Sequence, residues 1–254
     1  MTFAQNALSL TVHAPSLVSG DGRPSALVRA METALGGARL DWTISDDGEL
    51  VRLSRREAWI AQGRAEGPGL PLVCNGGTES SLVTVYGLQT SAASGPAGQP
   101  SFDIHADLPM DATHLAVIAE VLEAVARSAN AYWGHVTPFN TTVEISRQTT
   151  HPTRKPRTPP RGLPGLQFRE YLRSPEIPHR LGWMNYWSAA TARSLGFPDS
   201  SRDVDLLSRS RRTDTGAWVV QLTDAPLDLD QPLHLEALLC AYDRFPEIGG
   251  RSSS

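Results

Sequence analysis

A segment that can form neither a helix nor a central strand divides this chain. Residues 149–165 read TTHPTRKPRTPPRGLPG, with five prolines and a local run of Arg and Lys. Because proline lacks a backbone donor and fixes φ, this density of prolines excludes a regular element. We expect an exposed crossover loop, since connecting segments lie at protein surfaces. The sequence therefore predicts an N-terminal half at 1–148, a connector at 149–165 and a C-terminal half at 166–254.

The N-terminal half is predicted to alternate strands with helices. Residues 7–12 (ALSLTV) alternate apolar and polar side chains, as a half-buried strand does. Residues 111–131 have the strongest helical periodicity of the chain, with Leu115, Ile118, Val121, Leu122 and Val125 on one face. The other expected elements are a helix at 25–35, a strand at 40–45, a helix at 54–62 that opens with a Ser54–Glu57 capping box, and strands at 82–88 and 101–108.

The C-terminal half continues the same pattern, with strands at 182–188 and 217–223 and helices at 203–209 and 232–244. The predicted fold class is α+β, with mixed or antiparallel sheets and packed helices. Two segments echo each other: FDIHADLPMDATHLAVIAEVLEAV and WVVQLTDAPLDLDQPLHLEALLCAY both read as a strand, an acidic proline turn, a histidine and an amphipathic helix. Two readings stay open, since the halves can be related or the echo can reflect what any strand-to-helix turn requires.

Composition restricts the class of protein. Apolar residues make up 40% of the chain and include six tryptophans, enough to fill a substantial core without disulfides. No stretch approaches the ~20 apolar residues of a membrane helix, and the N-terminus lacks the basic start of a secretory signal. We expect a cytoplasmic protein with no membrane partner.

A net charge of −4 argues against a general nucleic-acid binder. Cys74 and Cys240 are predicted to be buried thiols in a reducing compartment.

The sequence contains no motif that announces catalysis. A glycine-rich phosphate loop, a nucleophile elbow, HExxH and paired cysteines are all absent. The spacing of the histidines does not fit a metal site, because His105 and His114 span a strand-to-helix junction and the others lie in separate segments. We predict that the protein is not an enzyme and uses neither a cofactor nor a metal.

The candidate binding residues lie in the C-terminal half. Asp224, Asp228 and Asp230 gather before the last helix, where three interpretations compete. They can form a carboxylate site, stabilise the start of a helix, or meet a basic partner. Trp183 and Trp187 lie on one strand, where inward side chains belong to the core and an outward one can anchor an interface. These five residues are the predicted binding set.

Two sequence blocks carry a resemblance to a known family. LGWMNYWS, followed by GAWVVQLTDAPLDLDQPLHLEALLCAYDRFPEIG, resembles the immunity protein 52 family of bacterial polymorphic toxin systems. The match covers about residues 175–250. Upstream, the chain is similar to an uncharacterised bacterial group that shares the NALSLTVHAPSLVSGDGRP opening and the RGLPGL and SPEIPH segments. The residues that match the immunity motifs are Gly182, Trp183, Met184, Pro226, Asp228, Asp230, Pro232 and His234, with Gln231 where Asn is more usual.

This resemblance implies an immunity protein for interbacterial competition, which binds a cognate protein toxin stoichiometrically and neutralises it. It implies no cofactor and no turnover, and it suggests that the motif residues determine the fold. Two other classes remain open. One is an enzyme that uses His105, His114 or the acidic cluster. The other is a regulatory nucleic-acid-binding module that uses the arm at 149–161 with Arg209, Arg211 and Arg212.

Overall fold

The computed structural model of the protein describes residues 6–63, 69–149 and 158–251. The chain forms two compact units. Unit 1 comprises Met1–Thr90 and Ser101–Ala131, and unit 2 comprises Ser91–Pro100 and Tyr132–Ser254. The segment expected to act as a connector, 149–165, belongs to unit 2, and its residues 150–157 lie outside the described part of the chain. Each unit is described by itself below.

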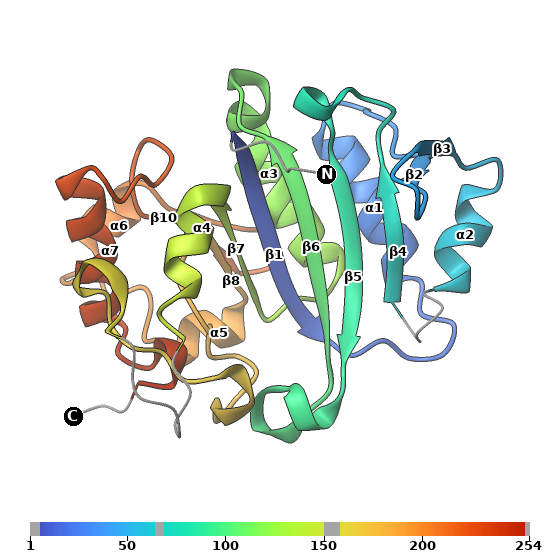
Figure 1. The fold of residues 1–254 in the computed structure, drawn as a ribbon. Helices are drawn as coiled ribbons and strands as arrows, with labels where there is room; N and C mark the ends of the chain where they lie inside the picture. Colours follow the sequence, from blue (N-terminus) through green and yellow to red (C-terminus); the bar gives the residue numbers. More distant parts are fainter. Residues whose placement is uncertain (1–5, 64–68, 150–157, 252–254) are drawn as a thin grey trace. The chain divides into compact units, whose positions relative to one another are not determined.

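Unit 1 is an antiparallel sheet with helices on one face (Figure 1). Its strand order is β3-β2-β4-β5-β6-β1, and each neighbouring pair is antiparallel. The strands are β1 (Ala7–Pro15), β2 (Trp42–Ile44), β3 (Leu50–Arg52), β4 (Gly69–Cys74), β5 (Thr84–Thr90) and β6 (Ser101–Pro109). The helices are α1 (Arg23–Ala34), α2 (Arg56–Gln62), α3 (Ala112–Ser128) and the 3₁₀ turn η1 (Glu79–Ser81).

The core of unit 1 lies between this sheet and α1 and α3. In β1 the apolar residues of the alternating pattern, Leu8, Leu10, Val12 and Ala14, are all buried. The helix α3 buries Ile118, Val121, Leu122, Val125 and Ala126, so the predicted apolar face is confirmed except for half-buried Leu115. Asp111 caps α3, because its carboxylate accepts a hydrogen bond from the backbone N–H of His114 at 2.9 Å.

Unit 2 contains a shorter antiparallel set of strands in the order β7-β8-β10-β9. These strands are β7 (Trp133–Pro138), β8 (Met184–Trp187), β9 (Arg211–Arg212) and β10 (Trp218–Gln221). The α-helices are α4 (Phe139–Ser146), α5 (Ala189–Ser194), α6 (Val204–Ser208) and α7 (Pro232–Arg244). The 3₁₀ turns are η2 (Ala92–Ser94), η3 (Pro96–Gly98), η4 (Pro160–Gly162), η5 (Arg169–Tyr171) and η6 (Ile248–Gly250).

An aromatic cluster fills the core of unit 2. The ring of Trp187 meets Phe197 and Phe245 edge to face, with ring centroids 5.1 Å apart in both pairs, and Trp218 packs against Phe197 at 5.2 Å. Edge-to-face pairs of this kind stabilise a core by about 0.5–1.5 kcal/mol each beyond the area that they bury. The cluster joins β8 and β10 to the end of α7.

The structure confirms the predicted α+β class, and α7 has the expected bounds. Other details differ. The capping box at Ser54 was wrong, because α2 begins after Arg55 and no side chain caps it. Cys74 is buried as expected, but Cys240 is exposed on α7. No helix in the described ranges combines the length and the apolar character that crossing a bilayer requires.

Candidate functional site

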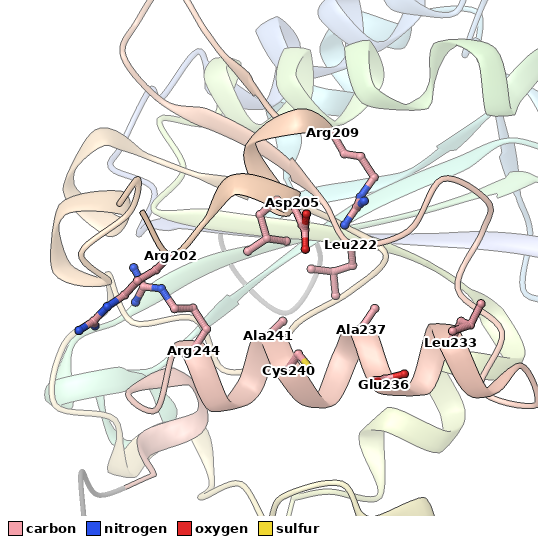
Figure 2. A pocket seen from close by; sticks show the side chains of 11 residues that line it. Arg202, Asp205, Arg209, Leu222, Leu233, Glu236, Ala237, Cys240, Ala241 and Arg244 are labelled. Carbon is pink, nitrogen blue, oxygen red and sulfur yellow. The ribbon is translucent and has the colours of Figure 1, made fainter. Parts of the chain in front are cut away.

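A groove between α6 and α7 is the candidate binding site of unit 2. It encloses a cavity of about 330 Å³ and is open to solvent (Figure 2). One wall is a stripe along α7, and the other is α6 with Leu222 from the end of β10. The stripe consists of residues at helical spacings of three and four, namely Leu233, Glu236, Ala237, Cys240, Ala241 and Arg244.

The opposite face of α7 explains why Leu233, Glu236 and Cys240 of this stripe stay exposed. Leu238 and Tyr242 point into the core of unit 2 and are fully buried. The phenol of Tyr242 accepts a hydrogen bond from the backbone N–H of Leu181 at 3.2 Å and lies 3.1 Å from the side-chain oxygen of Gln148. These contacts fix the rotation of α7 about its axis, so the stripe that contains Ala237 and Cys240 faces α6.

A buried ion pair holds the two walls together. The Nε of Arg244, on α7, donates to Asp203 at 2.7 Å, and Asp203 precedes α6 with no exposed side-chain surface. Asp203 also accepts a hydrogen bond from the backbone N–H of Asp199 at 2.7 Å, while Arg244 reaches the carbonyl of Gly196. A buried charge is tolerated only when it is paired in this way. The end of α7 is therefore anchored to the start of α6.

The groove carries two more arginines, which differ in their contacts. Arg202 has a side chain that is 72% exposed and lies 3.7 Å from Asp199. The Nε of Arg209 is buried and has no hydrogen-bond partner among the described residues. An unsatisfied buried donor costs about 1–3 kcal/mol. The buried Nε of Arg209 is therefore a local cost to the stability of this region.

The predicted acidic residues lie in the turn that leads into α7, between Leu222 and Leu233 of the groove. We call Thr223–Gln231 the acidic turn. Asp224 and Asp230 are exposed, whereas Asp228 is half-buried. The carboxylate of Asp228 accepts hydrogen bonds from the backbone N–H of Asp230 at 3.0 Å and from the side chain of Gln231 at 3.3 Å. Asp228 therefore shapes the turn, and the carboxylates of Asp224 and Asp230 lie at the surface.

An arginine fastens the acidic turn to α4. Arg161, in the predicted connector, lies 2.7 Å from both Glu144 and Asp230 and also donates to the carbonyl of Leu229 at 2.9 Å. These two carboxylates raise the pKa of Arg161. Arg161 adopts a left-handed φ of 56° to make these contacts. Here the Arg-rich segment has a structural role within its own unit.

Both tryptophans of the predicted binding set lie in the core. Trp183 and Trp187 are 3% and 1% exposed. The indole N–H of Trp183 donates to the carbonyl of Thr223 at 2.8 Å, so this residue supports the acidic turn from beneath. Gly182 lies so close to Thr137 and His135 that a Cβ has no room there. The Gly-Trp-Met motif therefore determines the fold, and the surface residues of the set are the aspartates.

His105, His114 and His234 have structural contacts. His105 stacks on Tyr86 with ring centroids 5.2 Å apart, and the Nδ1 of His114 lies 2.9 Å from the Asp111 carboxylate. The Nδ1 of His234 accepts a hydrogen bond from the backbone N–H of Asp228 at 3.1 Å. In the part of the chain that the structure describes, no three His, Cys, Asp or Glu residues are grouped as metal ligands would be.

A family model matches residues 19–253, nearly the whole chain. The chain belongs to the DUF5953 family, a domain of unknown function. No curated protein matches the sequence.

Among solved structures, this DUF5953 protein is similar to the Pseudomonas aeruginosa T6SS protein PA0821, with a TM-score of 0.57 and 13% sequence identity. The likeness covers 96% of this chain and 77% of that one. At this identity the match establishes a shared fold and nothing about partners.

Sequence reasoning missed one polar cluster in this DUF5953 chain, on β1 and β6. Across the two strands, Ser9 pairs with Asp107, Thr11 with His105 and His13 with Asp103. Ser9 donates to Asp107 at 2.7 Å, and the Nδ1 of His13 lies 2.9 Å from Asp103. Burial raises the pKa of Asp107. The signal was present in the alternation of ALSLTVHAP and SFDIHADL, whose polar positions face one another only once the register is known.

The groove was missed as well, although the sequence contained each of its residues. Its α7 stripe mixes leucine, alanine, cysteine and two charges, and such a mixture has no recognisable pattern. Only the packing of α6 against α7, fixed by Asp203 and Arg244, makes these residues one surface.

Proposed function

We propose that this chain is an immunity protein that binds a cognate bacterial toxin stoichiometrically and neutralises it in the cytoplasm. The observation that carries the proposal is the surface formed by the acidic turn and the α6–α7 groove. There, exposed charges lie beside Leu233, whose exposure is 76%. Large apolar side chains rimmed by charge are typical of protein interaction sites.

Three other observations support the same proposal. The immunity protein 52 resemblance covers residues 175–250, which include all of this surface. The shared fold with a T6SS protein is compatible with a role connected with secretion systems. Binding alone is sufficient for neutralisation, because a standard interface of ~1,600 Å² gives tight and specific complexes without turnover or a cofactor.

Within this proposal, Asp224 attracts a basic surface of the toxin, whereas Asp230 is already paired with Arg161 at 2.7 Å. Exposed charges of this kind accelerate association and select the partner more than they add affinity. Asp228 has a different part, because its carboxylate holds the turn. A charge-reversal test therefore changes Asp224 and leaves Asp228 and Asp230 in place.

The first test is co-expression with the C-terminal domain encoded by the gene immediately upstream. We expect that domain to stop growth alone, and we expect co-expression of this chain to restore growth and give a one-to-one complex on purification. Toxicity without rescue, or a harmless neighbour, contradicts the immunity proposal. In that case elemental analysis for a bound metal tests the enzyme class, and salt-dependent retention on DNA tests the nucleic-acid class.

The second test measures association kinetics with the purified toxin domain. The variant Asp224→Lys should associate about threefold more slowly at low salt, and the difference should shrink as salt increases. The matched control is Asp46→Lys, at an exposed position in a turn of unit 1. Equal slowing in both variants means that net charge, rather than the acidic turn, steers the encounter.

A further inference from the structure

Arg180 is a half-buried arginine of unit 2 whose side chain makes one hydrogen bond among the described residues. It lies in the loop before β8, between the buried residues His179 and Leu181. Its Nη2 donates to the Nδ1 of His179 at 3.4 Å. The Nε2 of His179 lies 2.8 Å from the carbonyl of Gln167, so Nε2 carries the ring proton and Nδ1 is the acceptor. The partner of Arg180 is therefore a neutral imidazole.

The positive charge of Arg180 has no carboxylate beside it. In the described ranges no Asp or Glu forms an ion pair with Arg180, whereas Arg244 is paired with Asp203 at 2.7 Å. Burial lowers the pKa of Arg180 and the charge of Arg169 lowers it further, while the phenol of Tyr242 acts in the opposite direction. Burial also raises the pKa of Tyr242, so this phenol is neutral near neutral pH. A second cation and a neutral phenol therefore surround Arg180.

The donors that Arg180 does not use toward His179 can reach a ligand. A guanidinium has five N–H donors, and the contact with His179 takes one of them. The Nε and Nη1 of Arg180 do not belong to the fully buried nitrogen atoms that lack a partner, so they remain accessible to solvent. Arg209 differs, because its Nε is buried. A small ligand in solution can therefore contact the guanidinium of Arg180.

The chemistry of this position favours an oxyanion. A charge that has lost part of its hydration is stabilised when it is paired with an opposite charge. A planar guanidinium binds a carboxylate or a phosphate through two parallel N–H···O hydrogen bonds. From these contacts we infer that Arg180 is a binding site for an oxyanion, a phosphate or a carboxylate, which it holds with the donors that His179 leaves open. This site goes beyond the proposed immunity function and does not depend on it.

The place of Arg180 in unit 2 connects oxyanion binding to stability. The backbone N–H of the next residue, Leu181, donates to the buried phenol of Tyr242 at 3.2 Å, which fastens the loop to α7. An oxyanion that binds the folded chain and not the unfolded chain stabilises the fold as its concentration rises. Urea unfolding of the full chain therefore reports binding at Arg180.

The experiment titrates sodium phosphate, or sodium acetate in a parallel series, from zero to about 20 mM, with sodium chloride keeping the ionic strength constant because concentrated salts alter stability in general. We expect the urea midpoint to rise and saturate, with an apparent dissociation constant below about 10 mM. Arg180→Gln should weaken this response at least tenfold. The matched control is Arg173→Gln, at an exposed position of the same loop, which should keep the dissociation constant within twofold.

The chloride buffer without phosphate or acetate provides a second readout. In that buffer Arg180 has no oxyanion to pair with, so Arg180→Gln should unfold at the same urea concentration as the natural chain or at a higher one. An arginine with a purely structural role gives the opposite result, a loss of stability in every buffer. Arg180→Lys keeps the charge without the planar fork and should bind phosphate more weakly than the natural chain.

Three results overturn the inference: no saturable response to either anion, an equal response in Arg180→Gln, and a loss of stability or of folding in Arg180→Gln in chloride. A response to phosphate alone supports a phosphate-bearing ligand, and an equal response to acetate supports a carboxylate. Co-expression with the toxin domain tests the immunity proposal separately, so the failure of one proposal leaves the other in place.

Discussion

In unit 1, β6 leads through Asp111 into α3, and in unit 2, β10 leads through the acidic turn into α7. Both helices carry a histidine three residues after the N-cap, at His114 and His234. Counted from that histidine, both helix regions have buried residues four, seven, eight and eleven positions later: Ile118, Val121, Leu122 and Val125 in one, Leu238, Ala241, Tyr242 and Phe245 in the other. The two segments therefore present the same face to their cores.

The entrances to the two helices differ. Asp111 caps α3 with its own carboxylate, and that carboxylate faces the Nδ1 of His114, so this nitrogen carries a proton. The side chain of Gln231 makes no capping hydrogen bond. The Nδ1 of His234 instead accepts a hydrogen bond from the backbone N–H of Asp228. The same residue type thus takes opposite hydrogen-bonding roles. The short turn at Asp111 leads directly into a core helix, whereas the longer acidic turn before α7 forms a charged surface beside the groove.

The largest expected effect comes from breaking the anchor at the end of α7. Arg244→Ala should lower the free energy of unfolding by about 3–5 kcal/mol, because it leaves the carboxylate of Asp203 buried without its partner. Urea unfolding measures this loss. The matched control, Arg202→Ala, removes an exposed arginine from the same groove and should cost at most about 1 kcal/mol. Equal costs mean that the ion pair does not hold the groove.

The shared core face can be tested by truncating the side chain at the same position in both helices. Ile118→Ala in α3 and Leu238→Ala in α7 should each cost about 2–5 kcal/mol, since both side chains are fully buried. Leu233→Ala removes an equal side chain from the groove end and should change stability by no more than about 0.5 kcal/mol. Thermal or urea unfolding of the three variants provides the comparison. A large loss at Leu233 contradicts its assignment as a free surface residue.

The difference in N-capping between α3 and α7 predicts a smaller difference in stability between two variants. Asp111→Ala should destabilise the protein by about 1 kcal/mol, because it removes the acceptor for a free backbone N–H at the start of α3. Gln231→Ala should be nearly neutral, since its side chain makes no cap. The start of α7 is stabilised by its packing rather than by a side-chain cap. A similar loss of stability in Asp111→Ala and Gln231→Ala would contradict this difference between the two helices.

The smallest effect concerns pH and the end of α3. Arg23 donates to the carbonyl of Ala129 at 3.0 Å and, through a side-chain hydrogen bond, lowers the pKa of Asp21 to about 2. A depressed carboxyl pKa contributes stability above the unfolded value of 3.8, and the contribution is lost as pH falls toward 2. Solvent screening keeps it below about 1 kcal/mol. Asp21→Asn should therefore lose less stability than the natural protein between pH ~5 and pH ~2.5, measured as urea midpoints.

The elements with strong periodicity were predictable from the sequence. The bounds of α7 and the apolar face of α3 follow from residues spaced three and four apart, and β1 follows from its alternation. The strands β4 and β7 were missed for a physical reason. Every residue of β7 is buried and all but one of β4, so neither alternates, and each contains a proline, Pro71 or Pro138.

The candidate site was less predictable than the fold. The sequence predicted that Asp224, Asp228 and Asp230 lie close together before the last helix. Their roles differ in the structure, because Asp224 and Asp230 are exposed and the Asp228 carboxylate holds the turn. Trp183 and Trp187 could not be assigned to core or surface until the strands around them were known. The groove depends on residues from two helices and the end of a strand, and its buried anchor joins positions 203 and 244. Such long-range pairings leave no mark in a single sequence.

The polar pairs across β1 and β6 also specify the register of these two strands. A slip of one residue turns Ser9, Thr11 and His13 toward the apolar core, which the pleat of a strand makes costly. A slip of two residues keeps the faces but sets His13 opposite His105 and leaves Asp103 opposite Pro15, in place of the observed alignment. The first strand of the chain and the sixth are far apart in sequence. Their polar residues specify the one alignment in which Asp107 lies opposite Ser9 and Asp103 lies opposite His13.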